Sequence, residues 1–234
     1  MKNKNLIVIK INGFTLVEIA IVLVIVGLLI TGLIMPLAAQ YDLKNYNETR
    51  TRVATIKEAI VGFAIVNGRL PCPADGTIAS GVPGAGLEVC TVTSVAGVVP
   101  WATLGLPETD AWNRRLTYHV TQSFTDGNPD ACDTSTTSFA LCSIGDITVT
   151  DSAVNIATNI PVLIVSHGKN GFGAFLSNGT QISSAAGSTN EQENADADSI
   201  FILSETNLQT FDDVVEWVSP NVLFNRMVTA GRLP

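Results

Sequence analysis

The stretch Gly13-Phe14-Thr15-Leu16-Val17-Glu18, followed by an aliphatic run from Ile19 to Ala39, decides the fold of this chain. The run holds 21 residues, none of them charged, and Thr31 is its single hydroxyl side chain. At about 1.5 Å per residue, a helix over it reaches about 31 Å, and the apolar core of a bilayer is about 30 Å thick. The sequence therefore predicts a membrane-spanning helix.

The residues before this run predict its orientation. The first 13 residues contain Lys2, Lys4 and Lys10 and no acidic residue. Because basic residues stay on the cytoplasmic side, we expect a cytoplasmic N-terminus and an exported remainder. A cleaved secretory signal ending at Ala39 is the alternative, but its apolar region would be too long, and Glu18 stands just inside its start.

The stretch from Gly13 to Glu18 resembles the processing and N-methylation motif of type IV pilins and type II secretion pseudopilins. The resemblance implies that residues 1–13 are a leader, that prepilin peptidase cuts after Gly13, and that Phe14 is then N-methylated. It also implies that Glu18, fifth in the mature chain, serves assembly. A carboxylate and a free Phe14 amine are both poorly tolerated in apolar surroundings, so pairing them between subunits would stabilise both. Alternatively, Glu18 lies at the headgroup boundary.

The helix is expected to continue beyond the membrane to Asn67. Apolar residues recur on one face of its second half, residues 40–68, while Asn67-Gly68 and Pro71 end the pattern. Pro36 removes a backbone hydrogen bond and crowds the carbonyl of Gly32, so a kink is expected there. Residues 14–39 thus form the membrane and polymerisation half. The face of the second half consists of Val53, Ile56, Ile60, Phe63 and Val66.

Residues 69–234 predict a β-rich exported domain with short apolar runs between turns. The segment 214–218 fits strand or helix, Pro220 to Ala230 fits a closing helix, and the polar segment 183–198 fits a mobile loop. The expected fold is therefore α+β and pilin-like, a long N-terminal helix packed on an antiparallel sheet. The clearest strands are 116–120, 147–150, 162–165 and 200–203.

Two further segments are similar to G-type pseudopilins. Leu104-Gly105-Leu106-Pro107 is followed by the run from Asp110 to Tyr118, in which Asn113 stands where that family prefers Gly. Asn also accepts a left-handed backbone, so the turn is expected to survive. The resemblance covers Gly13 to about Val120; the segment from Asp212 to Trp217 looks like the tail of a pilin-like subgroup.

Four cysteines, Cys72, Cys90, Cys132 and Cys142, follow the predicted span. On the oxidising side of the membrane they are expected to form disulfides, and three pairings are possible. The local pairing joins Cys72 to Cys90 and Cys132 to Cys142. The sequence contains no CxxC motif, which disfavours a zinc or redox site.

Composition argues against enzymatic and nucleic-acid-binding functions. The net charge is -8, whereas a nucleic-acid interface needs clustered Lys and Arg. His119 and His167 are the only histidines; His119 fits a surface or satisfied strand position, and His167 a strand end before a Gly-rich turn. Neighbouring Ser166 and His167 side chains in a strand point apart, so we expect no catalytic pair and no enzyme.

The resemblance to G-type pseudopilins raises calcium as a ligand, because some members of that family bind it in a loop between strands. Two oxygen-rich loops could supply ligands, although solvated acidic turns explain them as well. No other cofactor is expected. The candidate ligands are Asp126, Asn128 and Asp130 in one loop, and Glu193, Asp196 and Asp198 in the other.

Taken together, the residues and the resemblance imply a subunit of a type IV pilus or a type II secretion pseudopilus. Its expected partners are other subunits, prepilin peptidase, the inner-membrane assembly platform and, before assembly, membrane lipid. It would cross the inner membrane once, with its C-terminal domain in the periplasm, and then enter the fibre. The alternative is a membrane-anchored periplasmic binding protein that never polymerises.

Overall fold

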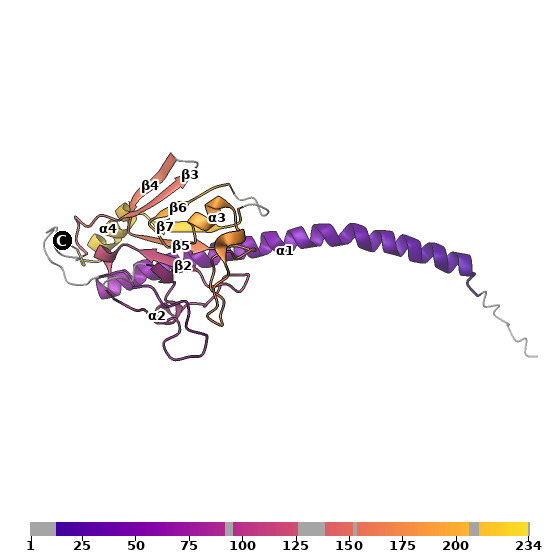
Figure 1. The fold of residues 1–234 in the computed structure, drawn as a ribbon, viewed down its shortest axis with the longest axis horizontal. Helices are drawn as coiled ribbons and strands as arrows, with labels where there is room; N and C mark the ends of the chain where they lie inside the picture. Colours follow the sequence, from indigo (N-terminus) through magenta and orange to yellow (C-terminus); the bar gives the residue numbers. More distant parts are fainter. Residues whose placement is uncertain (1–12, 92–95, 126–138, 152–153, 206–210, 234) are drawn as a thin grey trace, which may run out of the picture. The chain divides into compact units, whose positions relative to one another are not determined.

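The computed structural model describes residues 13–91, 96–125, 139–151, 154–205 and 211–233, without the side chains of residues 31–38. The chain divides into two compact units, Met1–Lys44 and Asn45–Pro234. Helix α1, Leu16–Asn67, contributes residues to both (Figure 1). It spans 52 residues and begins two residues later than expected, and the membrane-spanning role of its first half stays a prediction. Among the described residues, no helix combines the length and the hydropathy that crossing a membrane requires.

Helix α1 ends where the sequence predicts. Gly68 has a φ of 75°, a left-handed conformation that Gly adopts without strain, and its N–H donates to Ala64 O at 2.8 Å. Earlier in the helix, Gly32 and Pro36 lie in the stretch whose side chains are not described. The helical assignment continues through that stretch, and the kink stays a prediction.

A four-stranded antiparallel sheet forms the centre of the second unit, in the order β1-β2-β5-β7. The segment that fitted either strand or helix is therefore a strand, β7. The strands of this four-stranded sheet are β1 (Ala96–Val98), β2 (Thr117–Val120), β5 (Val162–Ser166) and β7 (Val214–Val218).

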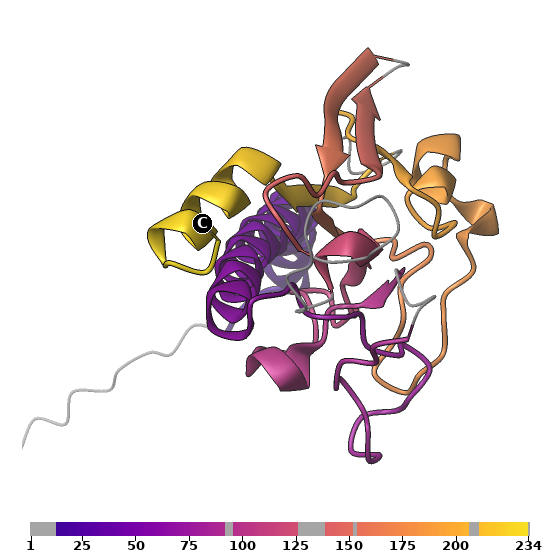
Figure 2. The ribbon, with the colours of Figure 1, turned by 90° about the vertical axis from the view of Figure 1, so that its left-hand side faces the viewer.

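One face of this sheet packs on the second half of α1 and on helix α4, Pro220–Thr229. Figure 2 shows α4 alongside α1, and Arg232 Nε donates to Ile65 O at 2.6 Å. The core between them confirms the predicted helix face in part, because Val53, Ile56 and Ile60 are buried whereas Val66 is exposed.

The opposite face packs on a second sheet of order β4-β3-β6. Strand β3 (Ile147–Asp151) pairs antiparallel with β4 (Val154–Ile160) and parallel with β6 (Ile200–Ile202). The expected α+β fold with an antiparallel sheet is thus confirmed, and the described residues add a second, mixed sheet that was not expected.

Short helical turns connect these strands: α2 (Trp101–Leu104), η1 (Gln122–Phe124), η2 (Ser184–Ala186) and α3 (Thr189–Glu193). The last two lie in the segment expected to be a mobile loop, and that expectation is wrong. Ser188 and Glu191 form a capping box at the start of α3, and Glu191 is buried. Its side chain accepts from Ser188 N at 2.7 Å and from Asn170 Nδ2 at 2.6 Å, which holds the segment in place.

Candidate functional site: the N-terminal arm and its processing motif

The motif from Gly13 to Glu18 is exposed and includes the first residues of helix α1. Gly13, Phe14 and Thr15 have no regular structure, and the Phe14 side chain is 82% exposed. A peptide bond between Gly13 and Phe14 is therefore accessible, and Gly13 presents no side chain that would obstruct a protease cleft.

Thr15 and Glu18 form a reciprocal cap on the helix. Glu18 Oε2 accepts from Thr15 N at 2.8 Å and from Thr15 Oγ1 at 3.0 Å, while Glu18 N donates to Thr15 Oγ1 at 3.3 Å. This is a capping box, which satisfies backbone donors that the first turn of a helix leaves free. Our sequence reasoning missed this role, although the spacing Thr-x-x-Glu is its known signature.

Apart from Glu18, the arm from Leu16 to Ile30 is apolar on all sides. Its described side chains from Leu16 to Ile30 are all exposed, with exposed fractions of 89% for Leu16, 65% for Leu23 and 71% for Leu28. An exposed apolar surface of this length marks a region that is covered in use by lipid or protein.

The segment from Asp110 to Tyr118 connects the sheet to the second half of α1. Arg52 Nη1 on the helix donates to Thr109 O at 2.7 Å and to Asp110 O at 2.9 Å, and Ala111 N donates to Thr49 Oγ1 at 3.2 Å. Asn113 has a φ of 62°, which confirms the predicted left-handed turn.

The buried Asp110 carboxylate organises this turn. Its Oδ1 accepts from Trp112 N and Arg114 N, and its Oδ2 accepts from Ser166 Oγ at 2.7 Å. Burial raises the pKa of Asp110, although these hydrogen bonds act in the opposite sense. The segments that resemble pseudopilins therefore serve to attach the sheet to the helix.

The one disulfide among the described residues agrees with the local pairing considered from the sequence. Cys72 is bonded to Cys90, which ties the end of helix α1 to the loop before β1. Cys132, the expected partner of Cys142, lies outside the described residues.

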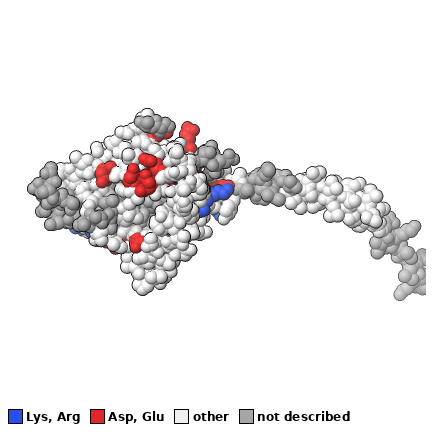
Figure 3. Space-filling model, viewed as in Figure 1, with Lys and Arg blue, Asp and Glu red and all other residues white. Residues whose placement is uncertain are grey.

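Of the two candidate calcium loops, the structure describes only the second. Asp126, Asn128 and Asp130 lie outside the described residues. The carboxylates of Glu193, Asp196 and Asp198 come within 4.8 Å of one another. Figure 3 shows acidic side chains gathered on the face of the second unit that it presents. Burial raises the pKa of Glu193, and the neighbouring charges of Asp196 and Asp198 add to the effect. Calcium binding there stays a prediction.

His167 belongs to a buried polar network that our sequence reasoning did not find. Its Nε2 lies 2.8 Å from Thr117 Oγ1, and its Nδ1 lies 3.8 Å from Asp213 Oδ1. Burial lowers the pKa of His167 to about 4, whereas burial raises the pKa of Asp212 to about 6. As expected, Ser166 and His167 have different partners. No local sequence pattern predicts this network, because its members lie far apart in the sequence and only the pairing of the strands brings them together.

Comparison with known families identifies the N-terminal motif. Residues 10–34 match the family model for the prokaryotic N-terminal methylation motif, the signal of type IV pilins and pseudopilins. The chain thus carries the signal of a pilin-like substrate of prepilin peptidase. Comparisons with curated proteins and with solved structures gave no significant match.

Proposed function

We propose that the chain is a structural subunit, a minor pilin or pseudopilin, that assembles into a type IV pilus or a type II secretion pseudopilus. The observation that carries this proposal is the methylation motif at residues 10–34, placed at the start of an exposed apolar helical arm. A soluble domain has no use for such an arm by itself, whereas lipid before assembly and neighbouring arms after assembly would cover it.

In this proposal, prepilin peptidase removes residues 1–13 on the cytoplasmic side and methylates Phe14. Residues 14–39 hold the subunit in the inner membrane, with the second unit in the periplasm, until the assembly platform extracts it. The Glu18 carboxylate then gives up part of its hydrogen bonding with Thr15 and instead accepts a hydrogen bond from the Phe14 amine of a neighbouring subunit. The proposal includes no catalytic activity, no cofactor and no direct contact with nucleic acid.

The decisive experiment is the intact mass and the N-terminal sequence of the protein extracted from membranes. A chain that begins at N-methylated Phe14 supports the proposal. A chain that begins at Gln40 would indicate ordinary secretion, and one that begins at Met1 a simple anchor. Either of these results would overturn it.

Assembly is tested separately with Glu18→Ala, measured as the amount of subunit in sheared fibres relative to the amount in membranes. Thr15→Ala is the matched control, because it removes the same cap and retains the carboxylate. Loss of fibre incorporation in Glu18→Ala alone supports a subunit. Unchanged behaviour of both variants supports a non-polymerising, membrane-anchored binding protein.

A further inference from the structure

Three acidic side chains come together in the interior of the second unit. Glu191 lies on α3, and Asp212 and Asp213 lie just before β7. Each of the three is at most 2% exposed, and their ligand atoms lie within 4.8 Å of one another. Buried carboxylates lose their hydration and repel one another, so a fold that gathers three of them needs a partner that compensates their charge.

Amide donors orient each of these carboxylates. Asn170 donates through Nδ2 to Glu191 Oε1 at 2.6 Å and through its backbone N to Asp212 Oδ2 at 2.9 Å. Asn194 Nδ2 donates to Asp213 Oδ2 at 2.8 Å. The Oδ1 atoms of both aspartates are buried and have no hydrogen-bond partner among the described residues. Carboxylates that ligate metal ions are typically hydrogen-bonded in this way, which leaves lone pairs for the metal.

His167 directs a nitrogen at this group from the position directly after β5. The residue is 0% exposed, and its Nε2 lies 2.8 Å from Thr117 Oγ1. Its Nδ1 has no hydrogen-bond partner among the described residues and lies 3.8 Å from Asp213 Oδ1. When Nε2 carries the proton and donates it to Thr117, the ring presents a lone pair at Nδ1. The 3.8 Å distance is less than twice a metal–ligand distance of about 2.1 Å, so one ion can contact both atoms.

Arg114 does not neutralise the carboxylates by direct contact, although its positive charge acts on Asp212. Its guanidinium donates instead to the backbone carbonyl groups of Trp112 at 3.1 Å and Asn170 at 3.4 Å. Burial, together with the charges of Asp212 and Glu191, raises the pKa of Asp213 well above its usual value. A cation would displace such a proton on binding.

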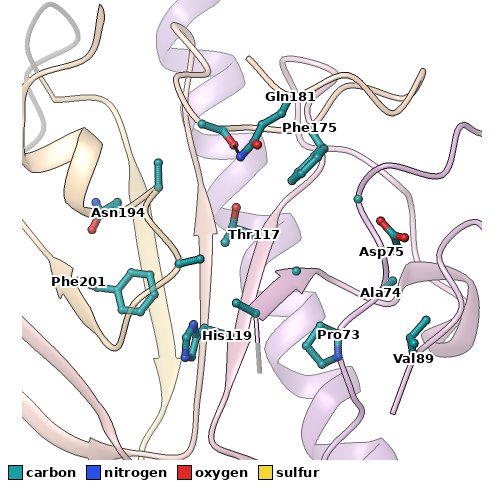
Figure 4. Close-up of a pocket in the computed structure, with 16 residues that line it drawn as sticks. Pro73, Ala74, Asp75, Val89, Thr117, His119, Phe175, Gln181, Asn194 and Phe201 are labelled. Carbon is teal, nitrogen blue, oxygen red and sulfur yellow. Dashed lines mark hydrogen bonds between the residues drawn. The ribbon is translucent and has the colours of Figure 1, made fainter. Parts of the chain in front are cut away.

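A cavity of about 420 Å³ gives an ion a route to this group. Thr117 and Asn194, which contact His167 and Asp213, are both among its lining residues, and Figure 4 shows them at the cavity wall. Gly168, with a φ of 54°, lies so close to Asp212 that a Cβ at this position would overlap the carboxylate. The ligands therefore lie one side chain behind the cavity.

We propose that this group binds one divalent transition-metal ion, with Zn²⁺ as the first candidate, through His167, Glu191, Asp212 and Asp213. A nitrogen donor beside carboxylate oxygens suits Zn²⁺, whereas Ca²⁺ and Mg²⁺ take oxygen ligands. The ion would join the end of β5, helix α3 and the start of β7, which are distant in the sequence. The site is distinct from the exposed acidic loop that follows α3, and it does not depend on the proposed function.

The test uses the full processed chain without an affinity tag, in detergent micelles, after EDTA treatment and dialysis. ZnCl₂ and CaCl₂ are titrated by calorimetry, and melting is followed with and without each ion. We expect Zn²⁺ to bind with a stoichiometry of about one per chain and to raise the Tm, because it binds the folded chain alone. An excess of Ca²⁺ should not displace it.

Nitrogen NMR of the chain labelled at histidine tests the imidazole ligand directly. The chain has two histidines, so His119 serves as the internal reference. Contrary to the expectation of an exposed or satisfied position, His119 is 2% exposed and neither ring nitrogen has a hydrogen-bond partner among the described residues. Zn²⁺ should shift the Nδ1 resonance of His167 and leave the resonances of His119 in place.

Two variants locate the ion. Asp213→Asn retains an oxygen for Asn194 but removes the charge, and His167→Gln removes the imidazole; each should weaken Zn²⁺ binding at least about tenfold. Glu58→Gln, exposed on α1, is the matched control and should bind as the parent does. If His167→Gln does not fold, the labelled resonance of the parent carries the test of the nitrogen ligand.

Stability separates a metal ligand from a structural side chain. Because Asp213→Asn removes a repelling charge, its metal-free form should melt at the temperature of the metal-free parent or higher, while the stabilisation by Zn²⁺ is lost. Any one of four results would overturn the assignment: no Zn²⁺ binds, binding survives in Asp213→Asn, the His167 resonance does not move, or Ca²⁺ displaces Zn²⁺. Loss of Zn²⁺ binding in Asp196→Asn would also overturn it, because the ion would then occupy the exposed acidic loop.

Discussion

The carboxylate of Glu18 accepts hydrogen bonds from both the backbone N–H and the hydroxyl of Thr15, at 2.8 Å and 3.0 Å. The residue proposed to receive the Phe14 amine of a neighbour is therefore already used within its own subunit. In the proposed assembly, a helix cap would therefore be exchanged for an ion pair.

This exchange predicts that the charge and the cap of Glu18 can be separated. Glu18→Gln retains a capping side chain but loses the charge, so it should form the helix normally and enter fibres poorly. Thr15→Ala should cost the helix about 1 kcal/mol and leave assembly largely intact. Helix content by circular dichroism and fibre incorporation check the two effects. Equal incorporation of Glu18→Gln and the parent would contradict a role for the charge.

Arg52 should hold the turn at Asp110 against helix α1. Its guanidinium donates to two backbone carbonyls that Arg52→Ala leaves without this donor, so we expect a loss of about 1–2 kcal/mol in the free energy of unfolding. Arg50 is exposed on the same helix, and Arg50→Ala is the matched control. Chemical denaturation followed by tryptophan fluorescence measures both. A similar loss in the two variants would show that helix charge, rather than the carbonyl contacts, matters.

Asn113 should tolerate Gly but not Ala. Its φ of 62° is left-handed, which costs a residue with a Cβ about 1–2 kcal/mol unless, as in Asn, the side chain can compensate locally. Asn113→Ala should lower the free energy of unfolding by about 1 kcal/mol, and Asn113→Gly should stay close to the parent. Denaturation of the two variants side by side is the measurement. Equal stability of both would mean that the turn rearranges.

Stability should depend on pH through Asp212. Burial raises its pKa in the folded chain from 3.8 to about 6. Its contribution is thus fully present below about pH 4 and is lost as the pH rises through 6, with a total of about 3 kcal/mol. His167, whose pKa falls from 6.5 to about 4, acts in the opposite sense, because the unfolded chain takes up its proton first as the pH falls.

The contribution of Asp212 is isolated by comparing the parent with Asp212→Asn at pH 4 to 7. The variant lacks the titrating group, so the difference in free energy of unfolding should move in its favour as the pH rises. A difference that does not change with pH would show that Asp212 titrates alike in the folded and unfolded chains.

The disulfide between Cys72 and Cys90 should stabilise the second unit, Asn45–Pro234. It closes a loop with a sequence separation of 18, for which the chain-entropy model gives about 3 kcal/mol. The double variant Cys72→Ala with Cys90→Ser avoids a stray thiol and should unfold at correspondingly lower denaturant concentration. Retention of parental stability would mean that the ion pair of Arg69 and Glu88, 2.8 Å apart, holds this loop without the bond.

Features written in local sequence were predictable. The extent of helix α1, its end at Asn67-Gly68, the closing helix α4 and most strands follow from periodicity, caps and turn residues within a few positions of one another. The processing motif is likewise a contiguous stretch, which the family model matches at residues 10–34. The mixed second sheet was missed because the pairing of β3 with β6 joins strands far apart in the sequence.

The sequence by itself determined the arm, its processing motif and its helical continuation, because each depends on neighbours along the chain. Tertiary structure alone decided which polar groups were satisfied. His167 meets Thr117 across 50 positions, and Glu191 is buried by contact with Asn170, whereas His119 is buried without any partner. Burial and hydrogen bonding of this kind depend on how distant strands and loops are brought together, so no local pattern could distinguish these side chains from exposed ones.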